Sequence, residues 1–153
     1  MSVIRLQLLV FATCLLTAAI GCSPAMRSAA GAALGAAAAA PVAPTAKIMI
    51  CGGEGHRTYL GCLSCSEYST DSIFNAYGNH GSRYSNASIW NQYYDFGSRY
   101  SIYGACNPYA TDPPVIVDQE GNFYGRLTMN GYHPQIGLGA QYRAWLANVV
   151  CQQ

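Results

Sequence analysis

The pattern of apolar and polar positions divides the chain into three parts. An apolar run covers residues 6–20 behind one positive charge, Arg5. Residues 23–46 are mostly Ala, Pro, Ser and Gly and show no amphipathic pattern. Residues 47–153 alone carry the alternating and helical patterns of folded elements. We therefore expect a single small domain over residues 47–153.

Short apolar segments on either side of the domain's centre predict two β-hairpins. The second hairpin matches the first at an offset of 64 residues and has Gly125 where the first has Gly61. A glycine inside a strand suggests a bulge or a close backbone approach. We expect the hairpins to join in one small antiparallel sheet. The predicted strands cover residues 47–51, 58–63, 114–117 and 122–128.

A 16-residue pattern fills the space between the hairpins. It reads Ser-Ile-aromatic-Asn, followed by Gly-Ser-Arg-Tyr-Ser. Such regularity is typical of one small structural unit used several times. The copies begin at residues 72 and 88, with a truncated third copy at residue 104.

Each copy is predicted to open with a short helix. In the first copy, Asp71 would cap residues 72–77 and Gly78 would end the helix in the left-handed conformation. Equivalent positions should bury equivalent faces. The residues expected in the core on this basis are Ile73, Phe74, Ile89 and Trp90.

Two further patterns complete the predicted fold. All twelve tyrosines lie between Tyr59 and Tyr142, where aliphatic residues are sparse, which favours a core built largely from aromatic rings. Apolar residues at helical spacing predict an amphipathic helix over residues 139–150. The fold class is therefore α+β: a small antiparallel sheet from two hairpins flanking the repeats, with a C-terminal amphipathic helix.

The N-terminal part has the order of an export signal. The apolar run is shorter than the roughly 20 residues of a spanning helix, and small residues follow it. Ala19-Ile20-Gly21-Cys22 resembles the bacterial lipobox, although Ala19 stands where that motif usually has Leu. The resemblance implies a signal peptide over residues 1–21, lipidation of Cys22 and a membrane-anchored lipoprotein of the bacterial cell envelope. Plain secretion and an uncleaved anchor stay open. Residues 22–46 would be the Ala/Pro-rich tether.

Charge and motifs exclude several functions. The net charge is +1 and there is no basic stripe, so no nucleic-acid partner is expected. No catalytic motif occurs, and neither a cofactor nor a metal is predicted. The carboxylates of Asp112, Asp118 and Glu120 could hold calcium, but a hairpin turn over residues 118–121 explains them better.

Two repeated pairs, Arg83-Tyr84 and Arg99-Tyr100, are the candidate ligand-binding residues. An arginine beside a tyrosine can stack on a sugar or hold an anion. The alternative is that each tyrosine packs inward while its arginine reaches solvent. The partner of such a surface would be a cell-wall polymer or another envelope protein.

The strings Ser-Ile-Phe-Asn, Gly-Ser-Arg-Tyr-Ser, Asn-Pro-Tyr-Ala and Pro-Pro-Val-Ile-Val-Asp resemble a small uncharacterised domain of exported bacterial proteins. The resemblance covers residues 57–130. It implies export but no particular activity, so a non-catalytic structural or binding role is favoured. The competing hypothesis is an envelope enzyme, either a thiol–disulfide protein or a hydrolase without a recognisable motif.

Five cysteines of the domain are disulfide candidates, because an exported compartment permits disulfides. Cys62 and Cys65 form a CxxC, but it follows a strand instead of opening a helix, which favours a structural bridge over redox chemistry. Cys106 stands where the other copies have an aromatic ring, and Cys151 follows the predicted helix, so at least one of them should be bridged. The candidates are Cys51, Cys62, Cys65, Cys106 and Cys151.

Overall fold

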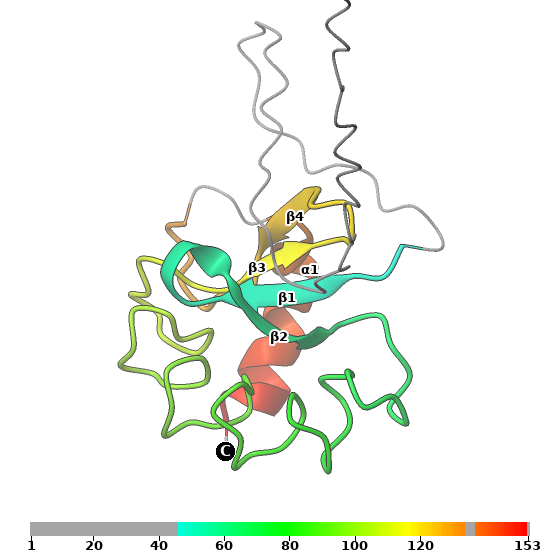
Figure 1. The fold of residues 1–153 in the computed structure, drawn as a ribbon. Coiled ribbons are helices and arrows are strands. Elements are labelled where there is room, and N and C mark those ends of the chain that lie inside the picture. Colours follow the sequence, from blue (N-terminus) through cyan, green and yellow to red (C-terminus); the bar gives the residue numbers. More distant parts are fainter. Residues whose placement is uncertain (1–45, 134–136, 153) are drawn as a thin grey trace, which may run out of the picture.

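The computed structural model describes residues 46–133 and 137–152 (Figure 1). The predicted signal peptide, the predicted lipidation site Cys22 and nearly all of the predicted tether lie outside these residues. The strands are β1 (Met49–Gly52), β2 (Thr58–Cys62), β3 (Val115–Val117) and β4 (Phe123–Arg126). The helical elements are the short 3-10 turn η1 (Glu54–His56), α1 (Gly137–Trp145) and the wider turn η2 (Leu146–Val150).

The strands form one antiparallel sheet in the order β2-β1-β3-β4, which confirms the predicted joining of two hairpins. Each outer strand shifts register against its inner partner next to a glycine. Gly61 has φ 121° and Gly125 has φ 131°, a region that residues with a Cβ rarely adopt. The two bulges expected from the sequence are therefore present at equivalent positions of the two hairpins.

The C-terminal helix is also confirmed, with two adjustments. α1 begins at Gly137, and its continuation η2 is wound more loosely. Figure 1 shows the helix lying against the sheet, with the segment between β2 and β3 wrapping around its far end. Leu146 and Val150 are fully buried, so η2 anchors the helix in the core.

Residues 66–110, all of them described, contain no helix and consist of successive tight turns. We call this part the turn segment. The predicted helix over residues 72–77 is wrong because side chains compete for its N–H groups. Ser72 Oγ accepts the N–H of Phe74 at 3.1 Å, and Asn75 Oδ1 accepts the N–H of Tyr77 at 3.1 Å. Asp71 pairs with Lys47 at 3.1 Å, and Gly78 is not in the left-handed region.

The same hydrogen bonds recur at 16-residue intervals along the turn segment. At each of three positions an asparagine accepts the N–H of the tyrosine two residues later and donates Nδ2 to a carbonyl six residues earlier. The asparagines are Asn75, Asn91 and Asn107, with Nδ2–O distances of 3.1, 3.2 and 2.8 Å. A further asparagine, Asn130, accepts from Tyr132 and donates to the carbonyl of Ala110.

The core is mainly aliphatic, so the expectation of an aromatic core is wrong. Ile73 and Ile89 are fully buried as predicted, whereas Phe74 is 39 % exposed and Trp90 is half-buried. The turns send most tyrosines outward, where their hydroxyls stay hydrated. The fully buried aliphatic residues include Ile50, Leu60, Ile73, Ile89, Ile116, Leu127, Leu146 and Val150.

Three positions spaced by 16 residues bind the turn segment to the C-terminal helix. Phe74 and Trp90 each contact the Trp145 ring edge-on, with centroids 5.7 Å away. The third position, Cys106, forms a disulfide with Cys151. The predicted bridge is confirmed. Because it spans 45 residues, its loop-closure entropy corresponds to about 4 kcal/mol in the chain-entropy model.

Candidate binding surface

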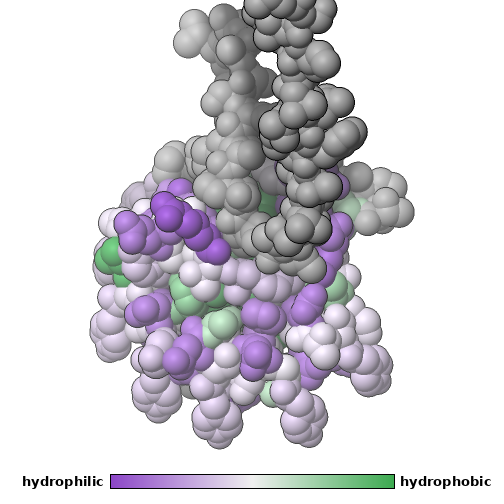
Figure 2. Space-filling model, viewed as in Figure 1, coloured by the Kyte–Doolittle hydropathy of each residue, from purple (hydrophilic) through white to green (hydrophobic). Residues whose placement is uncertain are grey.

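Seven tyrosines of the described residues stand out from the surface, each at least 80 % exposed. A large ring so fully exposed contributes little to folding. Figure 2 shows side chains projecting singly along the rim formed by the turn segment. We call the seven residues the tyrosine array. They are Tyr68, Tyr77, Tyr84, Tyr93, Tyr100, Tyr109 and Tyr132.

Every member of the tyrosine array shares one local hydrogen bond. Each tyrosine stands two residues after a Ser or Asn whose side-chain oxygen accepts the tyrosine N–H. For Tyr84 the acceptor is Ser82 Oγ at 3.3 Å, and for Tyr93 it is Asn91 Oδ1 at 3.1 Å. Such turns fix the backbone of the tyrosine. They do not by themselves set the direction of the ring, because the same bond precedes Trp90 and Tyr103, which pack against the core. The other acceptors are Ser66, Asn75, Ser98, Asn107 and Asn130.

The arginines of the two predicted pairs have different surroundings. Arg99 donates a hydrogen bond to the carbonyl oxygen of Cys151, so this guanidinium holds the C-terminal end of the fold. Arg83 is exposed and has no hydrogen-bond or ion-pair partner among the described residues. Tyr84 and Tyr100 both point outward, contrary to the alternative in which they pack inward.

Two neighbouring hollows lie beside Arg83. One has a volume of about 470 Å³ and the other about 330 Å³. Both are lined by Arg83, Tyr84 and Trp90, which therefore form a ridge between them. The sequence predicted a ligand-binding role for Arg83 and Tyr84, whereas for Trp90 it predicted only a place in the core.

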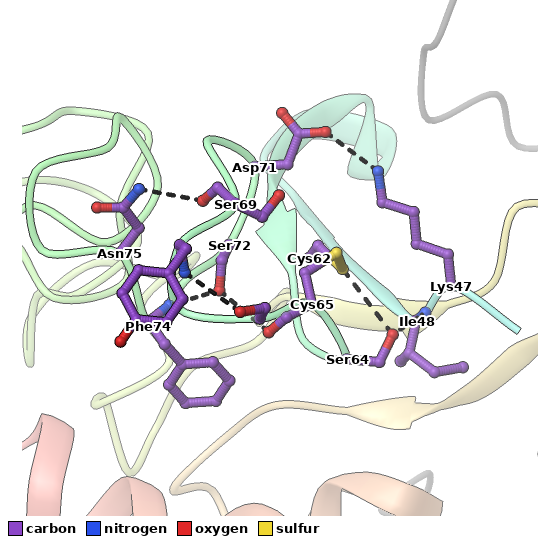
Figure 3. The surroundings of a disulfide bond; sticks show 12 residues. Lys47, Ile48, Cys62, Ser64, Cys65, Ser69, Asp71, Ser72, Phe74 and Asn75 are labelled. Atoms are coloured by element: carbon purple, nitrogen blue, oxygen red, sulfur yellow. Dashed lines mark hydrogen bonds and ion pairs between the residues drawn. A yellow bond between two sulfur atoms is a disulfide. The ribbon is translucent and has the colours of Figure 1, made fainter. Parts of the chain in front are cut away.

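The CxxC forms the disulfide Cys62–Cys65. Cys62 is fully buried at the end of β2, and its neighbour Ser64 accepts the N–H of Ile48 at 2.9 Å (Figure 3). In thiol–disulfide enzymes the attacking cysteine is accessible and stands at a helix N-terminus. Neither condition holds for Cys62, so this geometry fits a structural staple.

A cluster that the sequence did not reveal joins the first hairpin to β4. Asp112 Oδ1 lies 3.1 Å from His56 Nε2 and 3.2 Å from Arg126 NH1. Burial lowers the pKa of His56, and the attraction of Asp112 only partly opposes this effect. No pattern in the sequence marks the cluster, because its members come from three separate segments.

Asp118 has a structural role in the β3–β4 turn, as its sequence context predicted. Burial alone would raise the pKa of this carboxyl group, but hydrogen bonds from Asn122, Tyr124 and Glu120 hold the pKa below its usual range. The Tyr124 hydroxyl donates to it at 2.7 Å. In the described residues, no group of three His, Cys, Asp or Glu side chains is arranged to hold a metal ion.

Among the helices of the described residues, none has the length and apolar character needed to cross a membrane. Comparisons with protein-family models, with curated proteins and with solved structures found no match for this chain.

Proposed function

We propose that this protein is a non-catalytic cell-envelope protein, exported and anchored through a lipid on Cys22, whose tyrosine array binds a repeating polymer such as a cell-wall glycan. The 16-residue segments would be copies of one unit, with Tyr77 and Tyr84 exposed in the first copy, Tyr93 and Tyr100 in the second, and Tyr109 in the truncated third. The observation that carries the proposal is the tyrosine array itself, because seven rings that the fold does not need are exposed on successive turns.

A repeating ligand suits this surface. The flat face of a tyrosine can stack on a sugar ring, and its hydroxyl can bond to sugar hydroxyls. Contacts that are individually weak add up when ligand and protein both repeat, since later contacts form at high effective concentration. A protein partner is less well matched, because protein interfaces have a contiguous apolar core whereas these rings project singly (Figure 2).

The N-terminal part supports the same proposal. An Ala/Pro-rich tether over residues 22–46 would hold the domain away from the membrane surface. The array could then reach a polymer that lies beside the membrane. A structural staple at Cys62–Cys65 and Cys106–Cys151 would keep the small domain folded in an oxidising compartment.

The test replaces three equivalent tyrosines, Tyr77, Tyr93 and Tyr109, by serine. Retention of the full-length protein on isolated cell-wall sacculi should fall roughly tenfold, the equivalent of about 1.4 kcal/mol. Melting should hardly change, because exposed substitutions usually alter stability by no more than about 0.5 kcal/mol. The matched control replaces the same three residues by phenylalanine, keeps the rings and should retain most of the binding. Unchanged retention of the serine variant would contradict the proposal.

A further inference from the structure

We infer that the ridge formed by Arg83, Tyr84 and Trp90 is an anion-recognising subsite, which holds one sugar unit carrying a carboxylate or phosphate group. The inference rests on the proposed function and specifies its ligand: an acidic glycan. The two hollows beside the ridge would take the neighbouring sugar units of the same chain.

The first argument for this subsite is its charge. Arg83 has no partner in the described part of the chain, so its five N–H donors are available to a ligand. Among the described residues that line the two hollows, none is acidic. A guanidinium binds a carboxylate or phosphate group through two parallel hydrogen bonds, which fixes the orientation of the ligand.

The second argument is the pair of aromatic side chains beside Arg83, which belong to Trp90 and Tyr84. The Trp90 ring is held in place, since its Nε1 donates to the carbonyl of Ile73 at 2.7 Å and the ring makes an edge-to-face contact with Trp145. A ring that is already fixed loses little entropy when a sugar stacks on it. Tyr84 stands beside it and is 91 % exposed. One rigid ring, one accessible ring and one cation therefore border the same two hollows.

The polar groups of the larger hollow fit a sugar rather than a simple inorganic anion. Asn86 lines the hollow, is exposed and makes no hydrogen bond within the described residues. Gln92 lines the same hollow, and its Nε2 is buried with no hydrogen-bond partner in the described structure. Ring hydroxyls of a sugar could satisfy both amides, with a small side-chain movement for Gln92.

The equivalent positions 16 residues away do not reproduce this site. Glu67 stands 16 residues before Arg83, and Arg99, 16 residues after it, donates to the carbonyl of Cys151. Cys106 stands 16 residues after Trp90. Within the turn segment, anion recognition is thus confined to the surroundings of Arg83, while the tyrosines offer contacts along the whole rim.

The experiment measures binding of soluble oligosaccharides to the full-length protein in detergent, at about 0.15 M salt so that distant charges are screened. The probes are an oligogalacturonate, a phosphorylated mannan oligosaccharide and a neutral galactan of equal length. At least one acidic probe should bind about tenfold more tightly than the neutral one, as expected for a charge-assisted hydrogen-bonded pair. Whichever acidic probe binds better identifies the anionic group.

Arg83→Gln should reduce the affinity for the acidic probe to that for the neutral probe. Arg57→Gln makes the same charge change at another exposed site and should leave the preference intact. Equal binding of all probes to the unaltered protein, or equal losses in the two variants, would overturn the inference. The tyrosine-to-serine variant separates the two proposals. If it loses binding to sacculi while Arg83→Gln has no effect, the polymer-binding function stands and the anionic subsite falls.

Discussion

At the scale of a single residue, His56 links the stability of the fold to pH. Its side chain is largely buried and is paired with Asp112. Burial lowers the pKa of the imidazole in the folded protein below the ordinary value of 6.5. The unfolded chain therefore binds a proton more readily than the folded chain, so protonation favours unfolding.

We predict that stability falls as the pH drops from about 6.5 through the lower pKa of folded His56. Urea unfolding midpoints measured at pH 7 and pH 5 should show this fall. In His56→Gln the fall should be smaller, because glutamine does not titrate. This pH range lies above the one in which Asp118 takes up a proton, since the pKa of Asp118 is below its usual value of 3.8. An identical decline in the parent protein and in His56→Gln would refute the assignment.

At the scale of elements, an aromatic contact fastens α1 to the turn segment. Trp145 meets Phe74, Trp90 and, within its own helix, Tyr142, always edge-on and with centroids between 5.7 and 6.1 Å. Edge-to-face pairs of this kind contribute about 0.5–1.5 kcal/mol beyond their buried area. The contact therefore explains why Phe74 and Trp90 are aromatic although neither is fully buried.

Trp145→Ala should destabilise the domain by about 2–3 kcal/mol, somewhat less than truncation of a fully buried aromatic residue. The chain would stay folded because the Cys106–Cys151 bridge still holds the end of η2. Thermal unfolding with and without a reductant measures both effects, and reduction should destabilise the variant further. Tyr77→Ala removes a fully exposed ring and provides the control, with little change expected. Similar melting of the two variants would mean that the aromatic contact does not hold the helix.

The elements differ in how far the sequence predicted them. The hairpins, their glycine bulges and the C-terminal helix follow from patterns between neighbouring residues, and the structure has all of them. The short helices failed because Ser and Asn side chains suit a helix start and a chain of turns equally well. The sequence did contain a signal for turns: a Ser or Asn stands two positions before each exposed tyrosine, as Ser82 does before Tyr84.

At the scale of the whole molecule, the proposed lipid tether would determine where the tyrosine array acts. Cys22→Ser should prevent lipidation and move the protein from the membrane fraction to the soluble fraction, because the short apolar run alone would be cleaved. Fractionation of cells followed by mass measurement of the mature chain tests this expectation. A variant that remains full length and membrane-bound would show that the apolar run is itself the anchor.

The sequence by itself determined the sheet: strands from short apolar segments and bulges from glycine. It did not determine which rings are exposed, because the same turn bond precedes the exposed Tyr84 and the packed Trp90. The tertiary structure alone decided which of two identical Gly-Ser-Arg-Tyr-Ser strings carries an available cation. Arg99 reaches the carbonyl of Cys151, whereas Arg83 borders two hollows beside Trp90. The physical reason is that neighbouring residues fix each turn, but the surroundings of a side chain depend on which distant segment packs against it. The Cys106–Cys151 disulfide holds the C-terminal part of the fold beside the end of the turn segment that carries Arg99, and that placement makes the two arginines different.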